Sequence, residues 1–331
     1  MKLILGFSIP LLFGNLFQQF YSMVDTMIVG RVLGTGPLAA VGSTGSITFL
    51  IIGFCLGLCS GFAIPVAQRF GSRDYKELRR FIGNAVWLCV GFGIVLTVLT
   101  VIFCRNILEL MGTPADIIDD AYAYLVVIFA GIPATFLYNM LAGIQRAIGD
   151  SRTPVVILVI ASIINIVLDI VLVVFIPMGV AGAAVATVAS QLIGGVVCLL
   201  YVSKHYEVLK MTREDFKINV PCIKRLLSMG LPMALQTSIT AIGSVILQAS
   251  VNSLGSTVVA SITAGRTSVR VKLTVLGKAS KPAISSASSI PFWHCSSSCS
   301  SANGCFFCLS MPVRPPLSIL PIGTLCAVAF L

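Results

Sequence analysis

Apolar residues fill this chain in long continuous runs. Two of these runs, Val86–Cys104 and Gly179–Ser203, contain no charged residue. About 20 apolar residues are enough for a helix to cross the hydrocarbon core of a bilayer. The pattern therefore predicts an all-α polytopic membrane protein.

Turn residues and polar breaks divide the apolar sequence into seven membrane helices and the beginning of an eighth. The expected ranges are 3–29, 38–67, 83–104, 120–148, 157–173, 179–203 and 230–251, and Leu254-Gly255 turns toward the eighth. Pro10 lies inside the first helix. It is expected to bend that helix, because proline lacks the backbone donor that the preceding turn needs.

Composition and charge agree with a membrane protein and exclude other classes. Hydrophobic residues make up 57% of the 331 residues and charged residues only 10%, against about 25% charged residues in ordinary domains. The net charge of +10 gathers in the loops 68–80 and 204–225 and beside the turn 146–152. This bias towards alternate loops is the positive-inside pattern. We predict a multi-pass protein of the cytoplasmic membrane with a cytoplasmic N-terminus, in contact with lipid and not with nucleic acid.

Two carboxylates lie within the apolar runs. Asp25 is in the first predicted helix, and Asp169 follows Asn165 by four residues in the fifth. That spacing places Asn165 and Asp169 on one face of a helix. A carboxylate at membrane depth costs at least about 2.5–3.5 kcal/mol on insertion scales, so it marks a functional site by default. Both groups could exchange a proton for a cation, or they could only hydrogen-bond neighbouring helices.

The chain begins to repeat itself after a basic linker. Residues 33–41 resemble residues 254–262, as in transporters built from repeated helical bundles. Asp25 corresponds to Ile246 or Leu247 in the second copy, so the two copies are chemically unequal. We divide the chain into a first bundle (1–203), a linker (204–225), the start of a second bundle (226–265) and a tail (266–331).

The tail differs in character from the rest of the chain. It has no Asp or Glu, many Ser and five of the eleven Cys, and its helical periodicity stops. Such an abrupt change suggests translation out of frame from near Gly265, with a disordered tail as the alternative. The run of His294, Cys295, Cys299, Cys305 and Cys308 has part of the spacing of a zinc site. We attribute that spacing to chance and predict no metal site.

Four stretches in the same order resemble the multidrug and toxic compound extrusion (MATE) family of cation-coupled exporters. They are residues 24–30 (VDTMIVG), 149–154 (GDSRTP), 165–169 (NIVLD) and 179–187 (GVAGAAVAT). The resemblance implies two six-helix lobes around a central cavity. It makes this chain a MATE-like six-helix N-lobe bundle with a truncated second lobe, monomeric if the protein is full length.

The resemblance also implies a site and a mechanism. The positions that look equivalent to the family's coupling cluster are Asp25, Tyr124, Asn139, Asn165, Asp169 and Thr187, with Pro10 as the bend of the first helix. Gln236 and Thr240 occupy the region where the sodium-coupled branch tends to carry an acidic residue. We expect coupling to H⁺ or Na⁺ in the N-lobe, export of small, often cationic organic compounds, and no other cofactor.

Aromatic and methionine side chains of the same helices are candidates for the substrate cavity. They are Phe17, Tyr21, Met23, Tyr138 and Met140, with Gln236 from the second copy. Such side chains serve equally as ordinary packing. The cavity assignment therefore rests on the family resemblance.

Three other functions compete with antiport. A lipid-linked precursor flippase of the same superfamily would use a cationic cavity, and we place no Arg or Lys within the helices. A truncated chain could also be a non-transporting membrane fragment. An intramembrane aspartyl protease would need Gly-x-Gly-Asp, whereas the sequence before Asp150 is Ala147-Ile148-Gly149 and the residue lies in a turn. We therefore predict that the protein is not an enzyme.

Overall fold

The computed structural model describes residues 2–265, with side chains in the first helix given for residue 14, residues 16–19 and from residue 21 onward. The predicted out-of-frame tail, with its histidine and cysteines, lies outside the described residues. Every described element is a helix, which confirms the all-α prediction.

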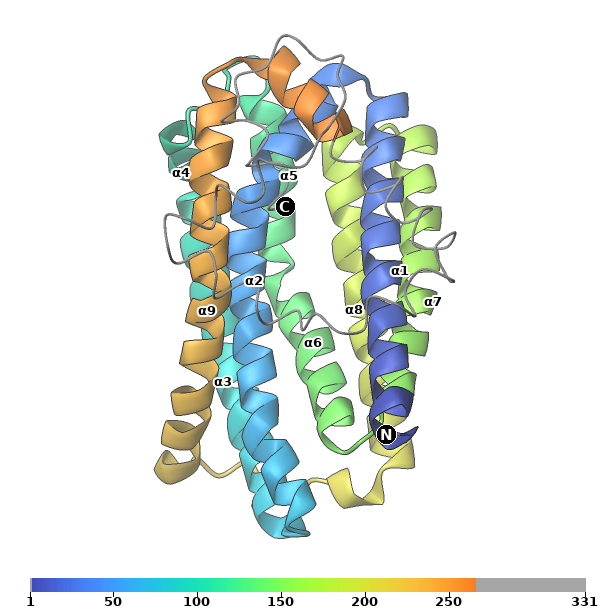
Figure 1. Ribbon diagram of the computed structural model, residues 1–331, viewed down its shortest axis with the longest axis vertical. Helices are drawn as coiled ribbons and strands as arrows, with labels where there is room; N and C mark the ends of the chain where they lie inside the picture. Colours follow the sequence, from blue (N-terminus) through green and yellow to red (C-terminus); the bar gives the residue numbers. More distant parts are fainter. Residues whose placement is uncertain (1, 266–331) are drawn as a thin grey trace, which may run out of the picture. The chain divides into compact units, whose positions relative to one another are not determined.

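The described chain folds as one bundle (Figure 1). In order, its elements are α1 (Lys2–Val32), α2 (Thr35–Gly71), α3 (Tyr75–Ile102), α4 (Cys104–Leu110), α5 (Ile118–Ala130), α6 (Ile132–Ala147), α7 (Arg152–Asp169), the π-helical η1 (Ile170–Phe175), α8 (Gly179–His205), the 3-10 turn η2 (Glu207–Leu209), α9 (Val220–Asn252) and a short helix Ser256–Gly265. Helices α1, α7 and α8 pack together, and α9 packs along α2.

The lengths and hydropathies of these helices fit a multi-pass membrane protein. Five of them, α2, α3, α7 with η1, α8 and α9, are long and apolar enough to cross a membrane. The pair α5 and α6 makes a sixth span when counted together. Helix α1, 31 residues long, lies beside them. The loops after α2, α6 and α8 lie at one end of the bundle (Figure 1), which agrees with the clustering of basic residues in these loops.

The prediction of one continuous helix over residues 120–148 is wrong. Helices α5 and α6 meet at Gly131 with a bend of 46°. Two local features explain the break. Pro133 follows in the first turn of α6, where its missing backbone donor costs nothing. A Cβ at Gly131 would lie 2.3 Å from the Val188 side chain of α8, so the bend also lets α8 approach.

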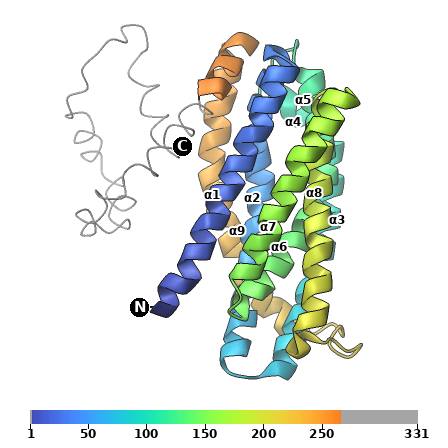
Figure 2. The same ribbon diagram turned by 90° about the vertical axis from the view of Figure 1, so that its right-hand side faces the viewer.

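Helix α1 is helical on both sides of Pro10 (Figure 2). The proline is therefore accommodated within a continuous helix, and the bend expected there stays a prediction. Its side chain lies outside the described part of α1.

Helix α9 begins at Val220, ten residues before the predicted start of the seventh helix and inside the predicted linker. Asn219 caps it by accepting a hydrogen bond from the Cys222 backbone at 3.2 Å, and Pro221 occupies the first turn. An Asn cap followed by Pro is a common helix start. The linker is held to α3 by Asn84, which donates to the Lys217 carbonyl at 3.3 Å and accepts from the Asn219 backbone at 2.8 Å.

Small residues let α2 and α9 approach at backbone distance. A Cβ at Gly57 would lie 2.5 Å from the Ala234 Cα, and a Cβ at Gly61 would lie 2.5 Å from the Gly230 Cα. Membrane helices associate without a hydrophobic driving force, so close packing of small residues is their main source of stability. This seam ties the start of the second copy to the first bundle.

The turn before α7 is fixed by Asp150. Its Oδ1 accepts from the backbones of Arg152 at 3.0 Å and Thr153 at 3.1 Å, and its Oδ2 accepts from the Tyr206 hydroxyl. Burial alone would raise its pKa, but hydrogen bonds from Thr153, Tyr206 and Arg152 hold the pKa of Asp150 below its usual value. Asp150 therefore acts as a cap that joins α7 to the end of α8.

We expect Gly57→Ala to destabilise the bundle by about 1–3 kcal/mol, because the added methyl group meets backbone that cannot move away. The measurement is the thermal midpoint of the purified chain in detergent. Gly45→Ala on the same helix is the matched control, since no atom lies within 4 Å of its added Cβ. Equal midpoints for the two variants would contradict the close contact between α2 and α9.

We expect Asp150→Ala to lower the free energy of unfolding by about 1 kcal/mol at pH 7, as for loss of a helix cap. A depressed folded-state pKa means that this contribution is complete above the unfolded pKa of about 3.9 and is lost as pH falls through the lower folded value. Thermal midpoints of the variant and the wild type should therefore differ at pH 7 and converge in acid, once the pH has fallen below the folded-state pKa of Asp150. A difference that persists unchanged in acid would show that the carboxylate charge is not what stabilises the turn.

Candidate functional site

Asp25 and Asp169 come together inside the bundle, where α1 packs on α7. Asp25 is 8% exposed and Asp169 is 0% exposed, and the two carboxylates interact electrostatically. Within the described residues, three carboxylate oxygens have no hydrogen-bond partner, namely both oxygens of Asp169 and Oδ1 of Asp25. An unpaired buried charge is very costly. Within the described residues, these carboxylates therefore lack the partners that would compensate a buried charge.

The helix changes its geometry at Asp169. This residue ends α7, and the next six residues form the π-helix η1. Short π-helical segments within α-helices are uncommon and occur frequently at functional sites. The change of pitch directly after a buried, unpartnered carboxylate therefore supports a functional assignment of Asp169.

Asn165 lies one turn before Asp169 and is 1% exposed. Its Nδ2 donates to the Thr187 hydroxyl of α8 at 3.5 Å, and its Oδ1 is buried without a partner among the described residues. The hydrogen bond to Thr187 of α8 thus orients the amide of Asn165, and the amide oxygen remains able to accept a hydrogen bond. Two of the predicted cluster residues, Asn165 and Thr187, are in this way linked across helices beside the carboxylate pair.

Two tyrosines complete the surroundings of the pair. Tyr124 of α5, predicted for the coupling cluster, is buried and interacts electrostatically with both Asp25 and Asp169. Tyr21 of α1, which we predicted for the substrate cavity, interacts with the same two carboxylates. Tyr21 thus lies beside the ion-coupling candidates, and it also lines a cavity that is described below.

Asn139 lies apart from the carboxylates. Its Nδ2 donates to the Thr135 carbonyl at 2.8 Å within α6, and its side chain lines a cavity with Asn165. Of the six predicted cluster positions, four lie around the fifth, Asp169, and the sixth, Asn139, belongs to this neighbouring cavity.

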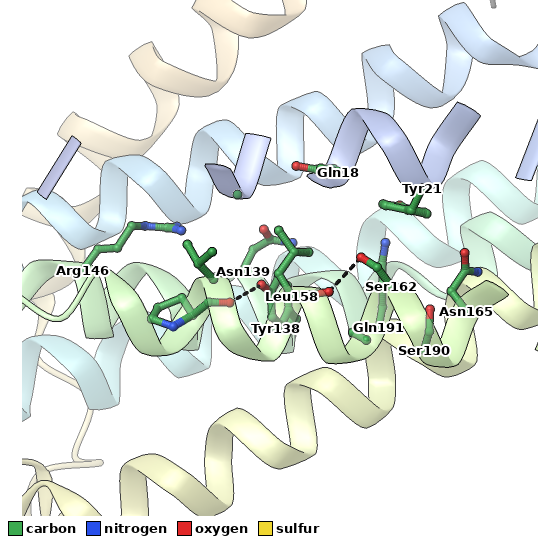
Figure 3. A pocket seen from close by; sticks show the side chains of 14 residues that line it. Gln18, Tyr21, Tyr138, Asn139, Arg146, Leu158, Ser162, Asn165, Ser190 and Gln191 are labelled. Atoms are coloured by element: carbon green, nitrogen blue, oxygen red, sulfur yellow. Dashed lines mark hydrogen bonds between the residues drawn. The ribbon is translucent and has the colours of Figure 1, made fainter. Parts of the chain in front are cut away.

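The cavity has a volume of about 100 Å³ and lies between α1, α6, α7 and α8 (Figure 3). Its polar lining comprises Gln18, Tyr21, Tyr138, Asn139, Arg146, Ser162, Asn165, Ser190 and Gln191. Sequence reasoning did not assign Ser162, Ser190 or Gln191. Gln191 lies four residues after Thr187 on an otherwise apolar helix, and that spacing could have indicated it.

Our statement that no Arg or Lys lies within the helices is wrong. Arg146 belongs to the last turn of α6 and lines the cavity. The error came from treating Arg146 as a loop residue beside Gly149. The sequence argument against a flippase was the absence of a cationic side chain from the cavity. Arg146 supplies such a side chain, so that argument no longer holds.

The other predicted cavity residues are scattered. Met23 and Met140 are buried in packing positions, and Phe17 is 40% exposed. Tyr138 lines the cavity and donates from its hydroxyl to the Pro154 carbonyl at 3.2 Å. Gln236 is exposed on α9. Only Tyr21 and Tyr138 from this set line the cavity.

Comparisons with known proteins agree with this architecture. Residues 10–171 match the MatE family model. The probable multidrug resistance protein YoeA of Bacillus subtilis is 33% identical over 257 residues, which are 76% of this chain and 56% of YoeA. YpnP of the same organism, also named a probable multidrug resistance protein, is 30% identical over 78% of this chain and 58% of its own length. The chain thus spans little more than half the length of these relatives.

Solved structures of MATE transporters have the same fold. An inward-facing conformation of a MATE family transporter superposes with a TM-score of 0.70 at 27% identity, over 74% of this chain and 56% of that chain. An outward-facing conformation gives a TM-score of 0.68 at 28% identity, over 73% and 53%. The family model, the relatives and the shared fold together place the chain in the MATE family.

Proposed function

We propose that this chain is part of a cation-coupled antiporter that exports small organic compounds across the cytoplasmic membrane. We assign the coupling H⁺ or Na⁺ to Asp25 and Asp169. One observation carries the proposal, namely that the buried carboxylate of Asp169 has no hydrogen-bond partner in the described part of the chain and lies beside a second carboxylate.

The arrangement suits exchange of a cation. Two neighbouring carboxylates in a low-dielectric site cannot both stay charged without compensation. Loading one proton or Na⁺ relieves this repulsion, and unloading restores it. The hydroxyl of Thr187 and the free amide oxygen of Asn165 supply neutral ligands of the kind that hard cations accept.

The coupling movement follows from the position of the pair. Asp25 belongs to α1 and Asp169 to α7, so neutralising either group changes the attraction or repulsion across the contact between these helices. We propose that loading of the pair repacks or bends α1 at Pro10 and so releases the substrate outward. Such a change requires that the ion bind the two conformations with different affinity.

The names of the relatives support the substrate class. YoeA and YpnP are named probable multidrug resistance proteins, and MepA of Staphylococcus aureus is named a multidrug export protein. We therefore propose organic, often cationic, compounds as cargo. Flipping of a lipid-linked precursor and absence of transport by this chain alone are the alternatives that the experiment below separates.

We expect Asp169→Asn to reduce cation-driven dye export by the chain at least tenfold, because asparagine keeps the shape of the side chain but cannot gain or lose a proton. Removing an unpaired buried carboxylate should leave the thermal midpoint unchanged or higher. The measurement is export of a fluorescent cationic dye from vesicles with an imposed H⁺ or Na⁺ gradient. Asp119→Asn is the control, since Asp119 is an exposed partner of Arg105.

Three results would contradict the proposal. Export that persists in Asp169→Asn would remove the coupling role. A lower thermal midpoint with intact export would show that Asp169 only stabilises the bundle. Absence of export from the wild-type chain would support the non-transporting fragment.

Ligand binding gives a second test that does not need transport. If Na⁺ is the coupling ion, adding it should raise the thermal midpoint of the wild-type chain, because a ligand that binds only the folded state stabilises it. We expect no Na⁺-specific increase in Asp169→Asn, with K⁺ at the same ionic strength as the reference. An increase that is equal in wild type and variant would place the sodium site elsewhere.

A further inference from the structure

Arg146 is a cation without a counter-ion inside the bundle. It lies in α6, is partly buried and lines the cavity between α1, α6, α7 and α8. None of the ion pairs and hydrogen bonds found among residues 2–265 includes its side chain. The groups that interact with it electrostatically are Tyr138, Cys59 and Cys198, which are ordinarily neutral at pH 7.

The position at the end of a helix does not by itself satisfy this side chain. The carbonyl end of α6 carries a partial negative charge that stabilises a nearby cation by about 0.3–1 kcal/mol. A guanidinium group, however, presents five N–H donors. Partial removal of these donors from water leaves a group that an oxyanion can pair with through two parallel hydrogen bonds.

The cavity is small, and its lining mixes polar and apolar side chains. Its volume is about 100 Å³. It is well below the roughly 300–1,000 Å³ of sites for drug-sized ligands. Arg146, Asn139 and Gln18 offer donors, whereas Val155 and Leu158 of α7 form an apolar wall.

Figure 3 shows how the lining side chains are arranged along this cavity. Arg146 lies at one end of the row of labelled side chains and Asn165 at the other. Arg146 is also close to the end of α6, three residues before the turn at Gly149. The cationic end is therefore near the end of the span, where lipid headgroups lie, and the carboxylate pair is beyond the opposite end.

We propose that Arg146 anchors a binding site for a single carboxylate or phosphate group, carried by an amphiphile whose apolar part lies against α7. The size of the cavity admits the anionic group and not a whole drug-sized molecule. The cavity reaches the surface of the bundle at α1, where its lining residue Gln18 is exposed and the neighbouring Phe17 is 40% exposed. An amphiphile could therefore keep its chain in the bilayer while its headgroup binds Arg146.

Binding of dodecyl phosphate to the purified 331-residue chain in a neutral detergent tests this site by calorimetry. We expect Arg146→Gln to weaken binding at least tenfold and Arg146→Lys to weaken it less, because lysine keeps the charge but not the paired donors. Arg105→Gln is the matched control, since Arg105 is exposed and already pairs with Glu109 and Asp119. Thermal midpoints without ligand show whether each variant is folded.

Two further probes identify the source of the anion. Inorganic phosphate should bind much more weakly than dodecyl phosphate if the ligand is an amphiphile, and dodecyltrimethylammonium should not compete. Tight, Arg146-dependent binding of inorganic phosphate alone would overturn the amphiphile assignment in favour of a soluble anion. Equal binding of dodecyl phosphate by wild type and a folded Arg146→Gln variant would overturn the site.

This inference does not depend on the coupling proposal. Asp169→Asn should abolish export and still bind dodecyl phosphate with wild-type affinity, because Asp169 does not line the cavity. Loss of phosphate binding in Asp169→Asn would show instead that the two groups form one site, and would overturn the separate oxyanion site.

Discussion

The scarcity of water inside a membrane bundle is the constraint on which this structure depends. A polar side chain at that depth must find a partner in its own helix, on another helix or in a ligand. Asn165 is oriented by Thr187 of α8, and Tyr138 donates to the Pro154 carbonyl of the next helix. Asp169 has no such partner within the described residues. The buried oxygens of Asp169 therefore remain without a partner among the described residues, as do Oδ1 of Asp25 and Oδ1 of Asn165.

Two contacts hold other parts of the bundle. Asp150 caps the start of α7, at the end of the helix opposite Asp169, and binds Tyr206 at the end of α8. On the other side of the bundle, small residues bring α2 and α9 to backbone contact. Neither contact supplies a partner for Asp169, whose oxygens stay unpaired among the described residues.

The two proposals concern neighbouring groups of opposite charge: a cation would bind Asp25 and Asp169, and an anion would bind Arg146. The carboxylate pair lies between α1 and α7, and Arg146 lies at the far end of the cavity that these helices share with α6 and α8. A cation loaded at the pair and an anion bound at Arg146 would each neutralise one unpaired group. The cavity, at about 100 Å³, is well below the size of sites for drug-sized ligands.

The sequence by itself determined the class of the protein and most of its helices. Charge-free runs long enough to cross a bilayer have few alternatives to helix, and buried Asp25 and Asp169 stand out because an apolar run tolerates so few charges. The family also followed from short motifs in the right order. These properties depend on local composition and spacing, which one sequence shows directly.

Other features were decided only by the tertiary structure. The bend at Gly131 depends on the approach of Val188 from α8, and the early start of α9 depends on a linker held by Asn84. The inclusion of Tyr21 in the ion site and the exposure of Arg146 to the cavity depend on how helices rotate about their axes. Helix rotation is set by packing between helices far apart in the sequence, and spacing along one helix does not contain that information.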